Sequence, residues 1–265
     1  MKKYIEIAKV LFRAQLVYRF DVALTAVGTA FRIIFAVILW GAVYEGRTDV
    51  AGFSYQAMLS YYIVTSLLRS FDLTDGVLSE VSDRIRNGTF TRFMTIPSNP
   101  LSYFMAQTLG AAAFHALFGL AAVVLSMIVF GINLTPVQSP AAILCAVIMV
   151  ALGQMFMMGY QFTLGLLAFK LGDIGLLRHV QGALLEFATG GIVPLIMLPL
   201  WAQGALGFLP FPHALYTPAM LLTGQIGAAQ AAGPMLILSA WTIAMILIAN
   251  STYNRLRVQY DGVGV

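Results

Sequence analysis

Long apolar stretches alternate with short polar ones along the whole sequence. This pattern predicts an all-α integral membrane protein, because a helix needs about 20 apolar residues to cross a bilayer. We expect six transmembrane helices. Their approximate ranges are 22–44, 53–75, 101–130, 141–169, 174–200 and 233–253.

The first 20 residues follow a different pattern. Polar residues recur every three or four positions, at Lys2, Glu6, Lys9 and Arg13, and mostly apolar residues fill the positions between them. A helix with this spacing has one polar and one apolar face. We expect residues 1–20 to form an interfacial amphipathic helix, although a disordered tail is the alternative. Residues 21–265 then form a single transmembrane domain.

The stretch between the fifth and sixth predicted spans is apolar but rich in helix-breaking residues. No charged residue occurs from 187 to 250, and the prolines there include Pro194, Pro199, Pro210, Pro212 and Pro218. One straight helix cannot contain so many prolines, because each removes a backbone hydrogen bond. We therefore expect a re-entrant or interfacial hairpin at about 201–231.

The composition agrees with a membrane protein, since 60% of the residues are hydrophobic, 10% are charged, and the mean hydropathy is +0.85. The 15 Lys and Arg outnumber the 11 Asp and Glu, and they lie mainly at the ends of apolar stretches. That placement is typical of cytoplasmic loops, so we do not expect nucleic acid as a partner. Only Arg47 falls on the opposite side. The protein is thus expected in the inner, cytoplasmic membrane with both termini in the cytoplasm.

Four polar residues are expected at depth in the membrane: Arg32, His115, Gln154 and Glu186. An unpaired charge at a helix centre costs roughly 2.5 to 3.5 kcal/mol, so we hypothesise that Arg32 pairs with Glu186. Such a pair could belong to a substrate path or could only fix the packing, and both interpretations stay open. His115 could instead bond to a backbone carbonyl of a neighbouring helix.

Arg69, Asp72 and Asp75 lie near the end of the second predicted span, three residues apart. We expect them to neutralise one another on one helix face or to reach water. Asp72-Leu-Thr-Asp75-Gly76 also matches the opening of the metal-binding motif of membrane-embedded CDP-alcohol phosphotransferases. The match then fails, because Ser79-Glu80 replaces the Ala-Arg of that motif and no second aspartate pair follows. A phosphotransferase that uses Asp72 and Asp75 is the alternative function.

The sequence contains no Gly-rich phosphate loop, no zinc-protease motif and no Cys/His cluster. We therefore predict no catalytic residue and no metal site, and we expect that this chain does not hydrolyse ATP itself. Its single cysteine, Cys145, lies in an apolar stretch and is expected to be a small core residue.

A charged segment at about 77–97 interrupts the apolar pattern. Its arginines alternate with large apolar residues, so a short helix there would have one polar and one apolar face. Asn87 and Gly88 are typical of a helix stop, and Pro97 prevents the helix from continuing. We call residues 77–97 the coupling segment.

Several short motifs, taken in order and spacing, resemble the ABC-2 type permeases, which are the membrane subunits of bacterial ABC exporters. The motifs are Tyr18-Arg-Phe-Asp21; Trp40 with Tyr44; Ile85-Arg-Asn-Gly88 through Pro97; and a late series with Pro194, Pro199-Leu-Trp201, Leu209-Pro-Phe211, Tyr216, Pro218 and Gly224. The resemblance covers nearly the whole chain. The chain departs from the expected pattern at Arg32 and in the high Ala and Met content of spans three and four, which bears on the substrate.

The resemblance implies a type V exporter-like fold and a particular set of partners. The chain would pair with a second permease, identical or paralogous, and the complex would contain two copies of a separate ABC ATPase. ATP and Mg would bind to that ATPase, so no cofactor is expected on this chain, which otherwise contacts membrane lipid.

The resemblance also implies that the coupling segment contacts the ATPase. The residues concerned are Arg84, Ile85, Arg86, Asn87, Gly88, Phe90, Arg92 and Phe93. Ile85, Phe90 and Phe93 would enter a groove on the ATPase, and the arginines would meet acidic residues at its rim. An ordinary cytoplasmic loop is the alternative, but it would not explain Phe90 and Phe93.

By the same resemblance, the second and fifth spans would line the substrate path at the dimer interface. Its polar residues would be Arg32, Arg69, Asp72, His115, Gln154 and Glu186. The outer gate would be formed by Pro194, Pro199, Trp201, Pro210, Phe211 and Tyr216. The family exports drugs, antibiotics, peptides and other amphipathic molecules by alternating access, so we expect such a substrate here.

Overall fold

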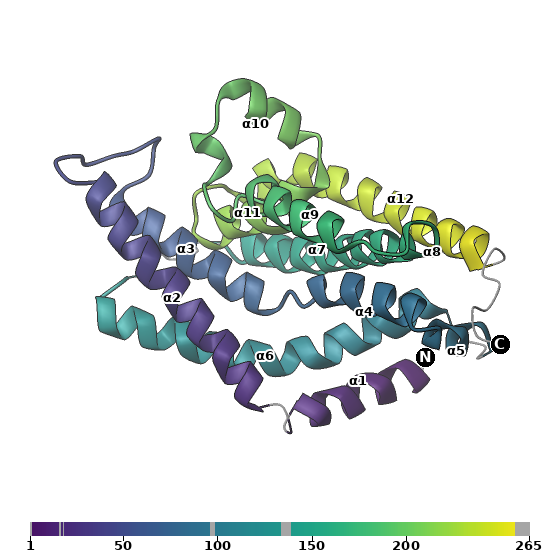
Figure 1. Cartoon of the computed structure of the whole chain (residues 1–265). Helices are drawn as coiled ribbons and strands as arrows, with labels where there is room; N and C mark the ends of the chain where they lie inside the picture. The colour runs from purple at the N-terminus through teal and green to yellow at the C-terminus, as the bar shows by residue number, and fades with distance from the viewer. Residues whose placement is uncertain (1, 16, 18, 96–98, 134–138, 258–265) are drawn as a thin grey trace.

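The computed structural model describes residues 2–15, 17, 19–95, 99–133 and 139–257, in which helices are the only regular secondary structure (Figure 1). The elements are α1 Lys2–Gln15, α2 Arg19–Val43, α3 Tyr55–Ser70, α4 Asp75–Arg86, η1 Thr89–Thr91, α5 Arg92–Thr95, α6 Pro100–Phe130, α7 Pro140–Leu166, α8 Ala168–Leu171, α9 Gly175–Ala188, η2 Leu195–Met197, α10 Leu200–Gly207, α11 Pro210–Leu222, η3 Ala228–Ala231 and α12 Ala232–Leu256. The prediction of an all-α protein is confirmed.

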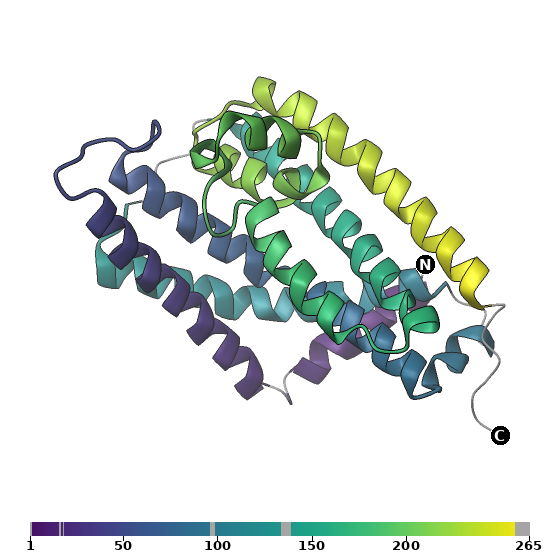
Figure 2. The ribbon, with the colours of Figure 1, turned by 45° about the horizontal axis from the view of Figure 1, so that its top comes forward.

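Within the described residues, four helices are long and apolar enough to cross a membrane. Their ranges are Ala23–Val43, Pro100–Phe130, Pro140–Leu171 and Ala228–Leu256, which correspond to the first, third, fourth and sixth predicted spans. Helices α7 and α12 lie side by side, and α11 packs against both of them (Figure 2). The chain is therefore a multi-pass membrane protein.

The second predicted span contains one helix, α3, that ends earlier than expected. Helix α3 ends at Ser70, and α4 begins at Asp75. Between them, Oδ1 of Asp72 accepts hydrogen bonds from the backbone N and the Oγ1 of Thr74, at 3.0 and 2.7 Å. An aspartate that bonds to the backbone two residues ahead favours a turn over a helix. The predicted end of this span near Asp75 was wrong for this reason, and a membrane crossing by α3 stays a prediction.

The fifth predicted span is also shorter than expected, because α9 ends at Ala188 rather than near residue 200. Gly190 follows with a φ of +76°, and Pro194 comes soon after it. Helix α3 fixes this linker: the hydroxyl of Tyr61 donates to the carbonyl of Gly190 at 2.6 Å, and that of Tyr62 donates to the carbonyl of Ile192. The linker from α9 to α10 is thus attached to α3.

Gly190→Ala is expected to lower the free energy of unfolding by about 2 kcal/mol. A side chain strains the positive φ, and the added Cβ would lie 3.1 Å from the hydroxyl of Tyr61. Gly204→Ala is the matched control, because Gly204 lies in α10 with no atom within 4 Å of an added Cβ. Thermal unfolding in detergent measures the midpoint temperature of both variants. Equal midpoints for the two variants would contradict the attachment of the linker to α3.

The predicted hairpin at 201–231 consists of α10, α11 and η3. Helix α10 projects from the bundle, whereas α11 is buried against α7 and α3 (Figure 1). The ring of His213 joins the two helices, since its Nδ1 lies 3.0 Å from Oγ1 of Thr217 and its Nε2 lies 3.0 Å from the carbonyl oxygen of Gly207. Whether this hairpin re-enters the membrane stays a prediction.

A helix forms near the N-terminus as predicted, and α1 packs along α6. The backbones meet closely at Gly110, where an added Cβ would lie 2.3 Å from the carbonyl oxygen of Ala8. The rings of Phe12 and Phe114 meet edge to face with centroids 5.6 Å apart. The apolar face of α1 therefore covers α6, and its place at the membrane surface stays a prediction.

Candidate translocation and coupling sites

Arg69 and Glu186 form an ion pair inside the bundle. Nη1 of Arg69 on α3 donates to Oε1 of Glu186 on α9 at 2.5 Å, and its Nη2 lies 3.5 Å from Oγ1 of Thr189. The side chains are partly buried, Arg69 at 22% and Glu186 at 34% exposed, so breaking the pair would leave a charge that water solvates only in part. This pair fixes α9 to α3.

The hypothesis that Arg32 pairs with Glu186 was wrong. Arg69 occupies that position, and within the described residues no ion pair involves Arg32. The expected bridge among Arg69, Asp72 and Asp75 does not form, because Arg69 turns to α9 and Asp72 bonds to Thr74; the alternative, contact with water, agrees with the exposure of Asp75.

Asp75 bonds to α7 rather than to Arg69. Nε2 of the completely buried Gln161 donates to Oδ1 of Asp75 at 2.7 Å. Loss of solvent around this carboxylate and, after it, the negative charge of Asp72 raise the pKa of Asp75 above its ordinary value. Gln161 was missed in the sequence, although it lies seven residues after Gln154 and so shares a face of α7 with it.

A small polar cavity of about 70 Å³ lies between α3, α4, α7, α9 and α11. Its polar lining includes Arg69, Asp72, Asp75, Gln154, Glu186 and Thr189. The structure thus brings together four of the six polar residues predicted for the path. Arg32 and His115 do not line this cavity, and the buried Nδ1 of His115 has no hydrogen-bond partner.

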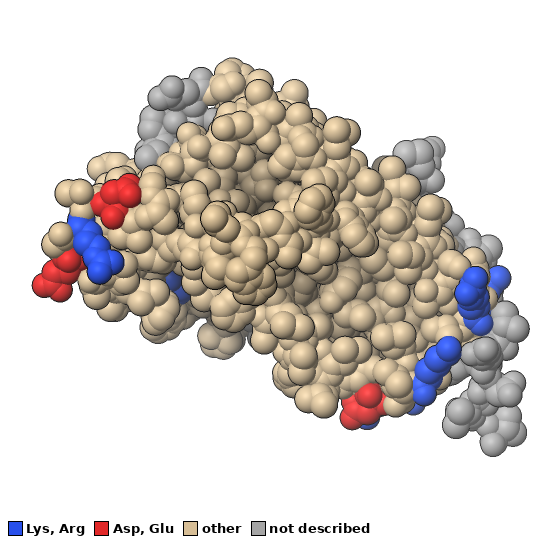
Figure 3. Space-filling view, turned by 90° about the horizontal axis from the view of Figure 1, so that it is seen from above, with Lys and Arg blue, Asp and Glu red and all other residues tan. Residues whose placement is uncertain are grey.

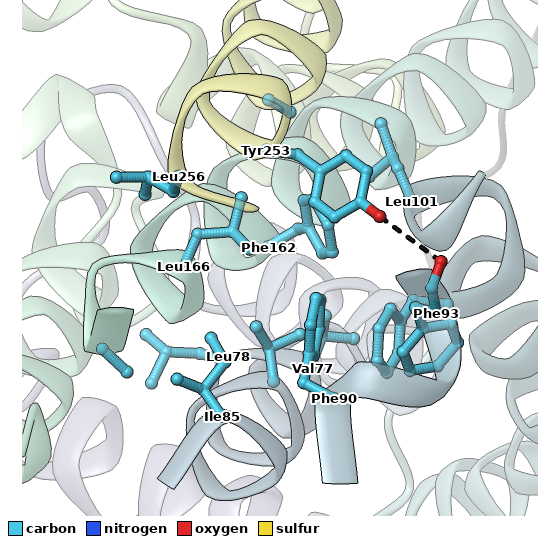
Figure 4. Packing of buried hydrophobic residues seen from close by; sticks show 14 of the residues in the cluster. Val77, Leu78, Ile85, Phe90, Phe93, Leu101, Phe162, Leu166, Tyr253 and Leu256 are labelled. Carbon is cyan, nitrogen blue, oxygen red and sulfur yellow. Dashed lines mark hydrogen bonds between the residues drawn. The ribbon is translucent and has the colours of Figure 1, made fainter. Parts of the chain in front are cut away.

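The apolar residues of the coupling segment lie inside the protein (Figure 4). Phe90 is fully buried, and Ile85 and Phe93 are more than nine-tenths buried. They pack among residues of α4, α6, α7 and α12, and the hydroxyl of Tyr253 on α12 bonds to the carbonyl of Phe93 at 3.4 Å. The prediction that these three side chains enter a groove on a partner was wrong, because their own chain buries them.

The polar residues of the coupling segment remain outside. Arg92 and Asn87 are exposed, and Arg86 is half-exposed with its Nη1 3.9 Å from Oδ1 of Asp173. Arg84 is held closer to the protein, since its Nη2 lies 2.6 Å from Oε1 of Glu80. Gly88 has a φ of +73° and turns the chain, as the helix stop at Asn87 and Gly88 predicted. Residues 96 and 97 of the segment lie outside the described residues.

Charge is distributed unevenly over the protein. Figure 3 shows Lys, Arg, Asp and Glu near the two ends of one face, and an almost uncharged surface between them. The start of α1, the end of α12 and the coupling segment share one of these ends (Figure 1). This distribution is typical of a protein whose uncharged belt faces lipid.

The predicted gate residues divide into two groups. Trp201 is 77% exposed on α10, and Pro199 before it is exposed as well. Pro194 and Pro210 are buried. Phe211 packs on Phe156 and Tyr160, with ring centroids 5.5 Å apart in both cases, and Tyr216 packs on Tyr61. These residues do not form one cluster in this structure.

The described part of the structure places no further metal ligand beside Asp72 and Asp75, the two aspartates of the alternative phosphotransferase site. Among the described residues, no group of three or more His, Cys, Asp or Glu side chains could hold a metal ion.

Comparison with known protein families gives a match: a family model described as "ABC-2 family transporter protein" matches residues 30–264. Among curated proteins, none matches the sequence.

Proposed function

Because the chain belongs to the ABC-2 transporter family, we propose that this permease is the membrane subunit of an ATP-driven exporter for an amphipathic substrate. A separate ABC ATPase provides the energy, in two copies, and a second permease completes the pathway. Both termini lie in the cytoplasm, and the chain resides in the inner membrane. The match over residues 30–264 carries this proposal, and the charge distribution at the end with the coupling segment supports it.

The way the coupling segment is built supports a role in force transmission. Its apolar side is anchored in the bundle, so a push on its polar side moves α4 as a rigid part of the protein. Helix α4 is connected to α9 by Arg178, whose Nη1 donates to Oγ of Ser79 at 2.9 Å, and to α7 by Gln161 and Asp75. Movement of α4 would therefore reach α7 and α9, two of the helices that line the polar cavity.

The ATPase contact is tested by reversing charge on the exposed side of the coupling segment. The double variant Arg86→Glu with Arg92→Glu is expected to weaken association with the ATPase at least about tenfold, since like charges meet at the contact. Pull-down of the ATPase with tagged permease in mild detergent measures this. Arg47→Glu, in the loop after α2, is the control and should leave association unchanged. Unchanged binding in the double variant would contradict the proposed contact.

Transport itself is tested in inside-out membrane vesicles that contain the permease and its partner ABC ATPase. We expect ATP-dependent uptake of an amphipathic dye into these vesicles, lost when the ATPase cannot hydrolyse ATP. Uptake that continues with the inactive ATPase, or a permease that never associates with an ATPase, would contradict an ABC exporter.

A further inference from the structure

A second and larger cavity, of about 640 Å³, lies between α3, α6 and α7. Helix α6 packs along α1 and α2, whereas α7 packs along α11 and α12. The two helices line the cavity with small side chains, at Ala112, Ala113, Ala146 and Ala151, which leave the space between them open. The volume is in the range typical of sites for small organic molecules.

The lining of this cavity is almost entirely apolar. No charged residue of the described chain lines it, and three of its 16 lining residues are polar. Thr74 donates its hydroxyl to Oδ1 of Asp72 at 2.7 Å, and Thr108 donates its hydroxyl to the carbonyl oxygen of Phe104 at 2.8 Å. The third, Gln154, lies on the wall that this cavity shares with the polar one. We call this space the apolar cavity, and it selects its occupant by hydrophobicity.

The apolar cavity opens where the protein meets lipid. Leu109 on α6 and Val147 on α7 line it, and they are 60% and 59% exposed. Ala113 and Ala151 also line it and are exposed. Both helices belong to the group long and apolar enough to cross the membrane, so their outer faces contact lipid chains. The lining residues of α6, at 105–113, lie in its first half, so the mouth opens in the half of the membrane nearer the coupling segment.

The inner wall of the apolar cavity belongs to an interior helix. Leu68 near the end of α3 and Phe71 directly after it line the cavity. Residues 57–70 of α3 are all buried or half-buried. Lipid that only covers the outer surface of the bundle therefore does not reach these two side chains. A molecule that contacts them from the bilayer must pass between α6 and α7.

An apolar space of this size is unfavourable when empty, because the atoms that line it lose contacts. Ordered water is a poor filling, since each buried water needs several polar partners. Hydrocarbon chains are present at the mouth in any bilayer. Met105, Met155 and Met158 line the cavity, and their flexible side chains adapt to a chain of variable conformation.

We propose that the apolar cavity binds a hydrocarbon chain of a membrane lipid, which enters between α6 and α7 and reaches Phe71. The head group stays outside the cavity, at the membrane surface on the side of the coupling segment, because the lining has no charge to hold it. The bound chain supports the wall shared with the polar cavity. This inference depends on the location of the protein in a membrane and not on the direction or substrate of transport.

Photolabelling of the full-length permease in nanodiscs tests the site. The bilayer is phosphatidylcholine with a small share of a phosphatidylcholine probe that carries a diazirine within one acyl chain. A phosphatidylglycerol probe with the same chain is compared with it. Both probes should label the peptide that contains Leu68 and Phe71, and to the same extent. Val124 on α6 is 46% exposed and lies outside the cavity, so its peptide is labelled by surrounding lipid and is the internal reference.

A double variant and a matched control make the test specific. Ala113→Phe with Ala151→Phe places two rings at the mouth and should lower the labelling of the α3 peptide about tenfold relative to the Val124 peptide. Both positions are exposed, so the rings displace the lipid chain without overpacking the core. Ala121→Phe with Ala141→Phe changes one exposed alanine on each of the same helices, outside the cavity, and should change nothing. Size-exclusion profiles and thermal unfolding verify that both variants are folded.

An α3 peptide that stays unlabelled in the folded permease would overturn the proposal, because the cavity would then be closed or covered by another protein chain. Equal labelling in the double variant and its control would also overturn it, since the label would reach α3 by another route. A strong preference for one of the two head groups would contradict a site that recognises only the chain. None of these measurements involves an ATPase, so they leave the proposed exporter function to its own tests.

Discussion

Replacement of Arg69 by methionine is expected to lower the free energy of unfolding by about 2 kcal/mol. The substitution leaves Glu186, whose side chain is 34% exposed, without its cation, and removing one partner of a partly buried ion pair leaves an incompletely solvated charge. Unfolding in mixed micelles with increasing SDS measures the change. Arg86→Met is the control, since its pair with Asp173 is half-exposed and long at 3.9 Å. That variant should change the free energy by less than about 1 kcal/mol.

A double-mutant cycle sharpens this prediction. Arg69→Met combined with Glu186→Leu removes both charges, so the double variant should be more stable than Arg69→Met alone. Transport should still be lost, because the polar connection between α3 and α9 is gone. If Arg69→Met and Arg86→Met were equally stable, the pair would not hold α9 to α3.

Replacement of Phe90 by alanine is expected to destabilise the isolated permease by about 3 to 5 kcal/mol. Phe90 is fully buried and contacts the rings of Phe93, Phe169 and Tyr253, so alanine leaves a cavity among α5, α8 and α12. The same unfolding measurement applies. Phe35→Ala is the control, because the side chain of Phe35 is 65% exposed on α2.

The outcome for Phe90→Ala separates two accounts of the coupling segment. If Phe90 entered a groove on the ATPase, alanine would weaken association with the ATPase and leave the stability of the isolated permease unchanged. If Phe90 anchors the segment, stability falls first, and any loss of association follows from it. A stable Phe90→Ala permease would therefore contradict the burial described here.

The sequence was sufficient to predict the fold class and four membrane helices, because long apolar stretches have few alternatives to membrane helices. It did not predict the break after Ser70, since that break depends on one hydrogen-bonded turn at Asp72. The early end of α9 was missed for a similar reason. Gly190 and the tyrosines of α3 fix the linker there, and such contacts between distant segments leave no local pattern.

The sequence indicated how deep the polar residues lie in the membrane but not to which side of each helix their side chains point. Arg32 and Glu186 were expected at one level, yet a residue count does not give the rotation of a helix about its axis. Arg69 therefore took the place that Arg32 was expected to fill. The same limit applies to Phe90, because an apolar residue in a charged segment indicates burial without indicating which chain provides the cover.

Cross-linking from the coupling segment is the most direct test of its proposed contact with the ATPase. In a Cys145→Ala background, Arg86→Cys places a thiol on the exposed side of α4, and Asp49→Cys places one in the loop before α3. A short bifunctional thiol reagent is applied to the permease–ATPase complex. We expect a cross-link to the ATPase from Arg86→Cys and none from Asp49→Cys. An intact complex that cross-links from Asp49→Cys but not from Arg86→Cys would contradict it.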